Sequence, residues 1–169
     1  FQDSDDQLFM TTVYDDVAFG PRNYKLDENE VKARVEEALD MVGIPHLIDR
    51  APYKLSGGEK RAAAIASVLS MKPDVLIMDE PTSGLDPKSR RRFINVLKGF
   101  SHTKIITSHD LDMVMETCNR VIILKEGKAA ADGTTLEILT NGELLDDCGL
   151  EVPLSMQKCP VCGTCKQGL

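Results

Sequence analysis

Two short stretches decide the fold class: Leu55-Ser56-Gly57-Gly58-Glu59-Lys60-Arg61 and Val75-Leu76-Ile77-Met78-Asp79-Glu80-Pro81. The first sets a hydroxyl and two glycines before an apolar pattern with helical spacing. It therefore predicts a helix N-terminus, where backbone N–H groups favour phosphate. The second is an apolar run, typical of a strand covered on both faces, that ends in two adjacent carboxylates. One carboxylate can hold Mg²⁺, usually through water, and the other can act as a general base, so the two stretches predict nucleotide hydrolysis.

Each stretch also has a simpler interpretation. Ser56 and Glu59 have the spacing of a capping box, which would start an ordinary helix. The second stretch would be a strand followed by an acidic turn. Capping and phosphate binding can hold together, and the pairing of the two stretches in one short segment favours the functional interpretation.

Composition sets outer limits on function. The chain has 169 residues, enough for one domain with a core, and a net charge of −7. An acidic balance gives no general support to nucleic-acid binding. No apolar run approaches the roughly 18 residues of a spanning helix, so we expect any membrane role to come through a partner. Because the first residue is Phe1, we expect a fragment cut within a domain.

Periodicity predicts alternating helices and strands, and therefore an α/β domain in which helices flank a sheet. Helices are predicted over 28–42, 57–70, 88–98 and 110–118, with another over 134–139. Buried strands are predicted over 75–78 and 104–107, and a hairpin over 120–131.

Further motifs in fixed order make the resemblance specific. The chain resembles the ATP-binding-cassette (ABC) ATPases: the stretch over 55–59 matches their LSGGE signature, and the stretch over 75–80 matches Walker B. The matches that complete the set are Gln2 (Q-loop), Ser83-Gly84-Leu85-Asp86 (D-loop) and Ser108-His109 (switch histidine). The resemblance implies a partial P-loop NTPase-type domain with a mainly parallel sheet and a helical subdomain.

The resemblance also implies a role for each matching residue. Glu80 would be the catalytic base, and His109 would contact the γ-phosphate of ATP. Asp79 and Gln2 would assist Mg²⁺ binding. The nucleotide-binding residues would be Gln2, Ser56, Gly57, Gly58, Glu59 and Asp86. In a dimer, the signature would serve the ATP held by the opposite subunit.

Three segments are expected. Residues 1–146 would form the partial ABC ATPase domain. Within it, 3–71 would be the helical subdomain that carries the signature, and 72–146 the core with Walker B, D-loop and switch histidine. Residues 147–169 would be a Cys-rich tail.

The N-terminal stretches 1–9 and 12–21 resemble the ATPases of energy-coupling factor importers, most closely their cobalt/nickel branch, although Ser4 stands where that family usually has Pro. This implies import of cobalt, nickel or another micronutrient, at the cytoplasmic face of the membrane. The implied partners are a second ATPase subunit, a transmembrane energy-coupling component and a substrate-binding membrane component, with no nucleic acid. The alternatives are a soluble ABC ATPase acting in DNA or translation processes, or a non-catalytic remnant with a metal-binding tail.

One family motif is missing from the 169 residues. No G-x-x-x-x-G-K-[ST] sequence occurs, so the lysine and backbone nest that grip the β- and γ-phosphates are absent from this chain. We therefore expect that these residues alone hydrolyse no ATP.

The tail carries a second candidate metal site. Cys159, Cys162 and Cys165 form C-x-x-C-x-x-C, and Cys148 is a candidate fourth ligand. Thiolates at this spacing suit a soft metal such as Zn²⁺. The alternative is a tail with free thiols.

Overall fold

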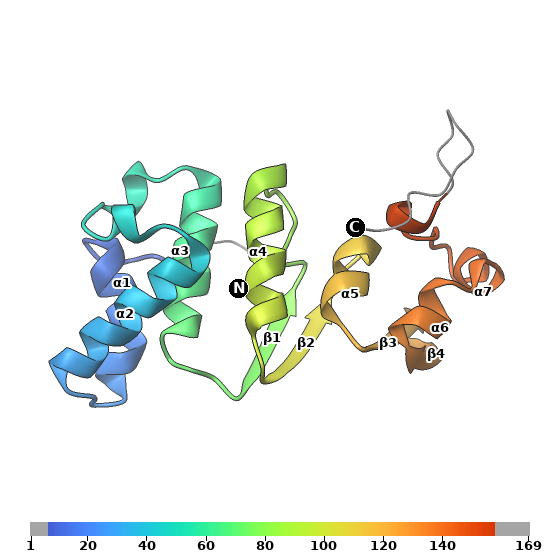
Figure 1. The fold of residues 1–169 in the computed structure, drawn as a ribbon, viewed down its shortest axis with the longest axis horizontal. Coiled ribbons are helices and arrows are strands. Elements are labelled where there is room, and N and C mark those ends of the chain that lie inside the picture. The colour runs from blue at the N-terminus through green and yellow to red at the C-terminus, as the bar shows by residue number, and fades with distance from the viewer. Residues whose placement is uncertain (1–6, 158–169) are drawn as a thin grey trace. The chain divides into compact units, whose positions relative to one another are not determined.

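The computed structural model describes residues 7–157 and divides the chain into two compact units, Phe1–Ile106 and Thr107–Leu169. The first unit holds the helical part and a strand–helix–strand segment, and the second holds a hairpin with short helices (Figure 1). The predicted boundary between residues 146 and 147 stays a prediction.

The helical part of the first unit is a packed trio (Figure 1): α1 (Val13–Asn23), α2 (Glu28–Val42) and α3 (Gly57–Leu69). The predicted helix over 28–42 is confirmed at both ends. Asp27 caps its start, and Gly43 ends it with a left-handed φ of 74°, a conformation that favours glycine. Its buried side chains recur at helical spacing and supply part of the core: Val31, Val35, Ala38, Leu39 and Val42.

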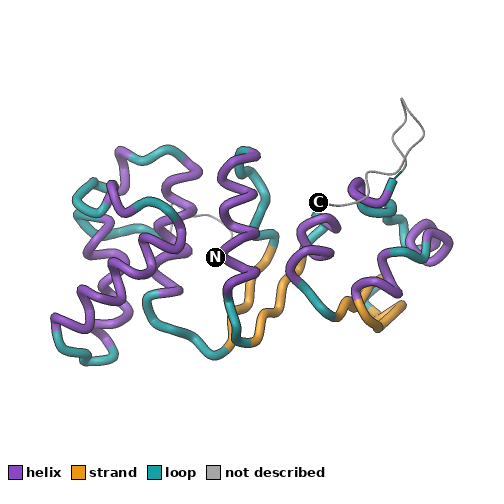
Figure 2. The backbone as a smooth tube through the Cα atoms, viewed as in Figure 1, coloured by secondary structure: helices purple, strands orange, loops and turns teal. Residues whose placement is uncertain are grey.

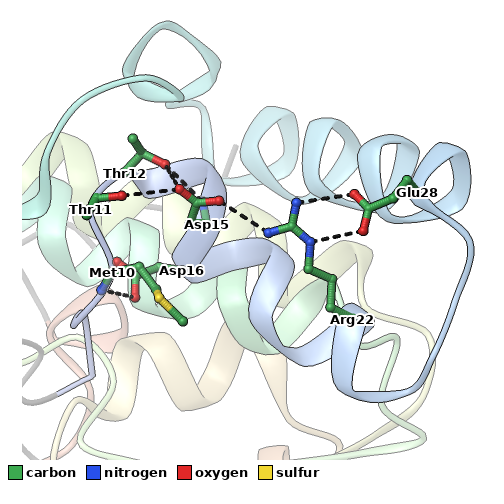
Figure 3. A network of polar contacts seen from close by, with 7 residues as sticks. All are labelled: Met10, Thr11, Thr12, Asp15, Asp16, Arg22 and Glu28. Carbon is green, nitrogen blue, oxygen red and sulfur yellow. Dashed lines mark hydrogen bonds and ion pairs between the residues drawn. The ribbon is translucent and has the colours of Figure 1, made fainter.

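A buried carboxylate ties the segment before α1 to that helix (Figure 3). Asp16 is 4% exposed, and its Oδ1 accepts the backbone N–H groups of Phe9 and Met10 at 3.0 and 3.1 Å. Its Oδ2 is buried and has no hydrogen-bond partner. Burial raises the pKa of Asp16 from its ordinary value of 3.8, against the opposing effect of the two amides. Asp15, one residue earlier, instead bonds the Thr12 hydroxyl at the helix start and the Arg22 guanidinium at its end.

The second part of the first unit is a β1–α4–β2 segment (Figure 2): β1 (Val75–Asp79), α4 (Pro87–Gly99) and β2 (Thr103–Thr107). The Thr103 amide donates to the Asp74 carbonyl at 3.2 Å, so the two hydrogen-bonded strands start side by side. That arrangement, with a helical crossover, is the parallel pairing expected from the sequence.

The expectation of strands covered on both faces is wrong for the residues that the structure describes. Leu76 is buried, but Ile77 is 72% exposed and Ile105 on β2 is 51% exposed. Successive side chains of a strand point to opposite faces, and the described helices cover only one of them. The continuous apolar run therefore gives a strand that is apolar on both faces, and residues 7–157 cover only one of those faces.

The second unit contains the predicted hairpin. β3 (Arg120–Lys125) and β4 (Lys128–Thr134) pair antiparallel, and the turn residues Glu126 and Gly127 both have positive φ, as type I′ turns require. Asp110 is the N-cap of α5 (Leu111–Thr117), and Thr134 is the N-cap of α6 (Thr135–Leu139). Each side chain accepts a backbone N–H group of the first turn of its helix. α7 (Gly142–Asp147) packs against α6.

Part of the predicted tail is anchored within this unit. The Asp112 carboxylate on α5 accepts the backbone N–H groups of Leu154 and Ser155 at 3.1 and 2.9 Å. These residues start a short 3₁₀ turn, Leu154–Met156. The segment at Leu154 and Ser155 is therefore held to α5. Within the described part of the chain, none of the helices has the length and apolarity that crossing a membrane requires.

Candidate nucleotide site

The signature starts α3 through a complete capping box. The Ser56 hydroxyl accepts the Glu59 N–H at 3.4 Å and donates to the Glu59 carboxylate at 2.8 Å, which also accepts the Ser56 N–H at 2.8 Å. These bonds from Ser56 hold the pKa of Glu59 below its ordinary value of 4.5. The predicted cap at Ser56 is confirmed. To donate to a phosphate, the Ser56 hydroxyl would have to leave the Glu59 carboxylate.

The glycines leave room beside this cap. A Cβ atom built on Gly57 would meet nothing within 4 Å, so the surface is open where a phosphate would approach the helix start. A Cβ on Gly58 would lie 3.7 Å from Asp86 Oδ2 and 3.6 Å from Ser89 Oγ. The structure thus brings the signature next to the D-loop aspartate, although the two are far apart in sequence.

Asp86 starts α4 as its N-cap. Its carboxylate accepts the backbone N–H groups of Lys88 and Ser89 at 2.9 and 3.1 Å. Hydrogen bonds from Ser89 hold the pKa of Asp86 below its ordinary value of 3.8, so it is anionic at neutral pH. The resemblance implied that Asp86 binds nucleotide. In this chain it has a local structural role as well.

The Walker B stretch ends at a strained residue. Asp79 is the last residue of β1 and is exposed, while Glu80 follows with a φ of 44°, which is unusual for a residue with a side chain. The Glu80 carbonyl accepts the Ser83 N–H at 3.1 Å, closing a turn over Pro81 and Thr82. Asp79 also lines a cavity of about 410 Å³ between α3 and β1, together with Gln7 and Arg61.

Arg61, which follows the signature, was not predicted to have a role in the site. Its Nη1 donates to the Ser83 carbonyl and its Nη2 to the Glu80 carbonyl, both at 2.8 Å. The acceptors lie 19 and 22 residues further along the chain, so no local pattern could have revealed these bonds.

His109 belongs to the second unit. The Leu111 N–H donates to the His109 carbonyl at 3.1 Å, and the Asp110 N–H donates to the Ser108 hydroxyl at 3.1 Å. With Asp110 capping α5, these bonds fix the backbone of the predicted switch histidine at the end of β2.

The remaining candidates fall partly outside the described residues. Gln2, Cys159, Cys162 and Cys165 do so entirely. Cys148, which follows α7, is a half-buried free thiol. Between residues 7 and 157, no three His, Cys, Asp or Glu side chains gather to hold a metal ion by themselves. The zinc site in the tail stays a prediction.

The described residues fit Mg²⁺ of the kind that accompanies a nucleotide. Such an ion needs only one or two protein carboxylates, because phosphates and waters complete its octahedron. Asp79, exposed at a strand end and lining the cavity of about 410 Å³, supplies one such carboxylate.

The fold is that of an ABC ATPase domain. A solved structure of cbiO1 from Clostridium perfringens, described as part of the ABC transporter complex cbiONQ, matches with a TM-score of 0.75. It is 44% identical, and the match covers 87% of this chain and 60% of that chain.

Sequence comparison gives the family. The ABC transporter family model matches residues 1–83. An ABC transporter ATP-binding protein of Geobacter sulfurreducens is 64% identical over 163 residues, 96% of this chain and 66% of the relative. The energy-coupling factor transporter ATP-binding protein EcfA of Methanothermobacter thermautotrophicus is 46% identical over 156 residues, 90% of this chain and 50% of the relative. The chain belongs to the ABC transporter ATP-binding protein family, and it spans 50% to 66% of the length of these two relatives.

Proposed function

We propose that this chain is part of the ATP-binding and ATP-hydrolysing subunit of an energy-coupling factor importer. The observation that carries the proposal is the contact between two motifs in one unit. The start of the signature helix lies against Asp86, within the segment that follows Glu80. Helix capping accounts for the Asp86 carboxylate, but it does not require the carboxylates of Asp79 and Glu80 at the strand end.

The chemistry is divided among the residues as follows. Glu80 accepts the proton of the water that attacks the γ-phosphate, and Asp79 holds Mg²⁺, which when bound neutralises phosphate charge. His109 contacts the γ-phosphate, and Gln2 contacts Mg²⁺ and the attacking water. Ser56, Gly57 and Gly58 receive the γ-phosphate of the ATP bound by a second ATPase subunit, through backbone N–H groups at the positive end of α3.

The subunit acts on the cytoplasmic face of the membrane, with a transmembrane energy-coupling component and a substrate-binding membrane component. The transported solute is cobalt, nickel or another micronutrient. The EcfA relative and the cbiO1 structure, named for an energy-coupling factor transporter and for a transporter complex, support the class of importer. Uptake of labelled cobalt and nickel by cells with and without the gene tests the solute. Equal uptake of both metals in the two strains would exclude them.

Hydrolysis is tested with Glu80→Gln in the complete protein that carries this chain. The amide keeps the size of the side chain but cannot take a proton, so we expect ATP binding to persist while the turnover rate falls by about 10²- to 10⁴-fold. Glu36→Gln is the matched control, because Glu36 is an exposed glutamate on α2 that pairs with Lys32 at 3.9 Å. Wild-type turnover in Glu80→Gln would refute the assignment of the base.

A further inference from the structure

We propose that Arg61 is a positioning residue that holds the Glu80–Ser83 turn, and through it the direction of the Glu80 carboxylate. The inference rests on the proposed function, because it concerns the base of that reaction. Its starting observation is that one guanidinium bonds the carbonyls of both the first and the last residue of the turn, each at 2.8 Å.

The turn needs such a clasp because its first residue is strained. Glu80 has a φ of 44°, a conformation that is costly for a residue with a Cβ and persists only where its surroundings impose it. The Ser83 N–H provides one bond to the Glu80 carbonyl, at 3.1 Å, and Arg61 provides the second. Pro81 fixes one further dihedral angle.

The clasp acts on the side chain through the backbone. Two bonds to the Glu80 carbonyl fix the plane of the peptide that follows Glu80, and a planar peptide leaves only φ and ψ to set where the Cβ points. A general base must lie within hydrogen-bond reach of the water it deprotonates, and a displacement of about 1 Å can cost about 10²-fold in rate. Arg61 can therefore affect hydrolysis without touching the nucleotide.

The geometry also explains why a guanidinium is used. Its planar fork presents two parallel donors, while lysine offers one compact ammonium on a flexible stem. Arg61 lies on α3, two residues after Glu59 of the signature, and α3 is packed by α1 and α2. The Arg61 guanidinium thus fixes the turn after Walker B relative to α3, the helix whose N-terminus carries the signature.

Two measurements on the complete protein test the proposal, with variants Arg61→Ala and Arg61→Lys. The control is Arg92→Ala, because Arg92 also donates to a backbone carbonyl within the first unit, that of Gly43 at 3.2 Å, away from the Glu80 turn. The first measurement is hydrogen exchange of the Ser83 and Leu85 amides, which close the turn and the bend after it. In Arg61→Ala we expect both to exchange about tenfold faster, the factor for losing a hydrogen bond of ordinary net strength.

The second measurement is ATPase kinetics. We expect Arg61→Ala to lower kcat by about 10- to 100-fold with KM for ATP nearly unchanged, Arg61→Lys to recover part of it, and Arg92→Ala to keep wild-type kcat. Unchanged exchange would overturn the clasp. Faster exchange with unchanged kcat, an effect confined to KM, or an equal loss in Arg92→Ala would overturn the positioning role. A wild type without ATPase activity would refute the proposed function itself, and the exchange result would then decide the clasp alone.

Discussion

Replacing the buried Asp16 by alanine tests the physical account of the first unit most directly. The substitution removes the acceptor of the Phe9 and Met10 amides, which bond Oδ1 at 3.0 and 3.1 Å. Figure 3 shows the bond of Met10. Each orphaned amide costs about 1–3 kcal/mol, and the lower end applies because both sites are only partly buried. Losing the buried Oδ2, which has no partner, gives back about 1 kcal/mol. The net expectation is a loss of about 1 kcal/mol in the free energy of unfolding.

Two further variants separate this explanation from others. Asp15→Ala is the matched control, because Asp15 is the preceding residue, is half-exposed, and bonds the Thr12 hydroxyl at 2.7 Å and Arg22 at 3.2 Å rather than the backbone before the helix. An exposed pair of this kind contributes about 0–1 kcal/mol. Asp16→Asn keeps one carbonyl oxygen for both amides, so we expect it to recover most of the loss.

Acidity gives an independent check on Asp16. Because its pKa in the folded state is raised above 3.8, the folded chain binds the proton more tightly than the unfolded chain. Its contribution to stability is therefore largest at low pH and falls as pH rises from about 3.8 through the raised value. Asp16→Asn removes this dependence, so the wild type should gain stability relative to Asp16→Asn when pH is lowered across that range.

Urea unfolding followed by circular dichroism measures these differences, and hydrogen exchange of the Phe9 and Met10 amides locates them. If Asp16→Ala unfolds within about 0.5 kcal/mol of the wild type, the usual range for featureless surface changes, the amides gain nothing from the carboxylate. An equal loss in Asp15→Ala would also refute the reasoning.

Two further predictions concern a cap and an anchor. Ser56→Ala should lower the free energy of unfolding by about 1 kcal/mol through loss of the α3 cap, and should also lower ATP turnover. Ser56→Thr should retain both the stability and the turnover. Equal stability of Ser56→Ala and the wild type would contradict the observed capping box. Asp112→Ala should speed hydrogen exchange of the Leu154 and Ser155 amides while leaving the hairpin amides of β3 and β4 unchanged, with Asp146→Ala as the control; protection that survives Asp112→Ala would show that these amides are held by something else.

Local chemistry made much of the fold predictable. The α2 stripe, the Ser56 and Asp110 caps and the hairpin turn at Glu126-Gly127 depend on residues within a few positions of one another. Helix α1 was not predicted, because Gly20 and Pro21 near its end are residues that usually interrupt helices. Pro21 is buried in the last turns of α1, where packing outweighs the missing N–H.

The parts of the site that could not be predicted are all contacts between residues that lie far apart in the sequence. Ser56, Asp79 and Glu80 were identified from their neighbours, but the approach of Gly58 to Asp86 and the bonds of Arg61 cross a strand and a helix start. Periodicity reports which face of an element is apolar and says nothing of which distant carbonyl a side chain will find. The prediction of a strand buried on both faces failed at Ile77 for the same reason. Burial of a strand depends on which other elements pack on its two faces, and the local pattern does not identify them.

The contacts of Arg61 and Asp86 bear on how two nucleotide sites could act together. In the proposed dimer, the signature serves the ATP of the opposite subunit, while Asp79 and Glu80 serve the ATP of their own. Within this chain those two sets of residues are joined by short, rigid steps: Gly58 lies against Asp86, and Arg61 holds the turn between Glu80 and Ser83. A shift of the α3 N-terminus when a phosphate displaces Glu59 from Ser56 would therefore reach the Glu80 carbonyl through bonds of 2.8 Å rather than through a flexible loop.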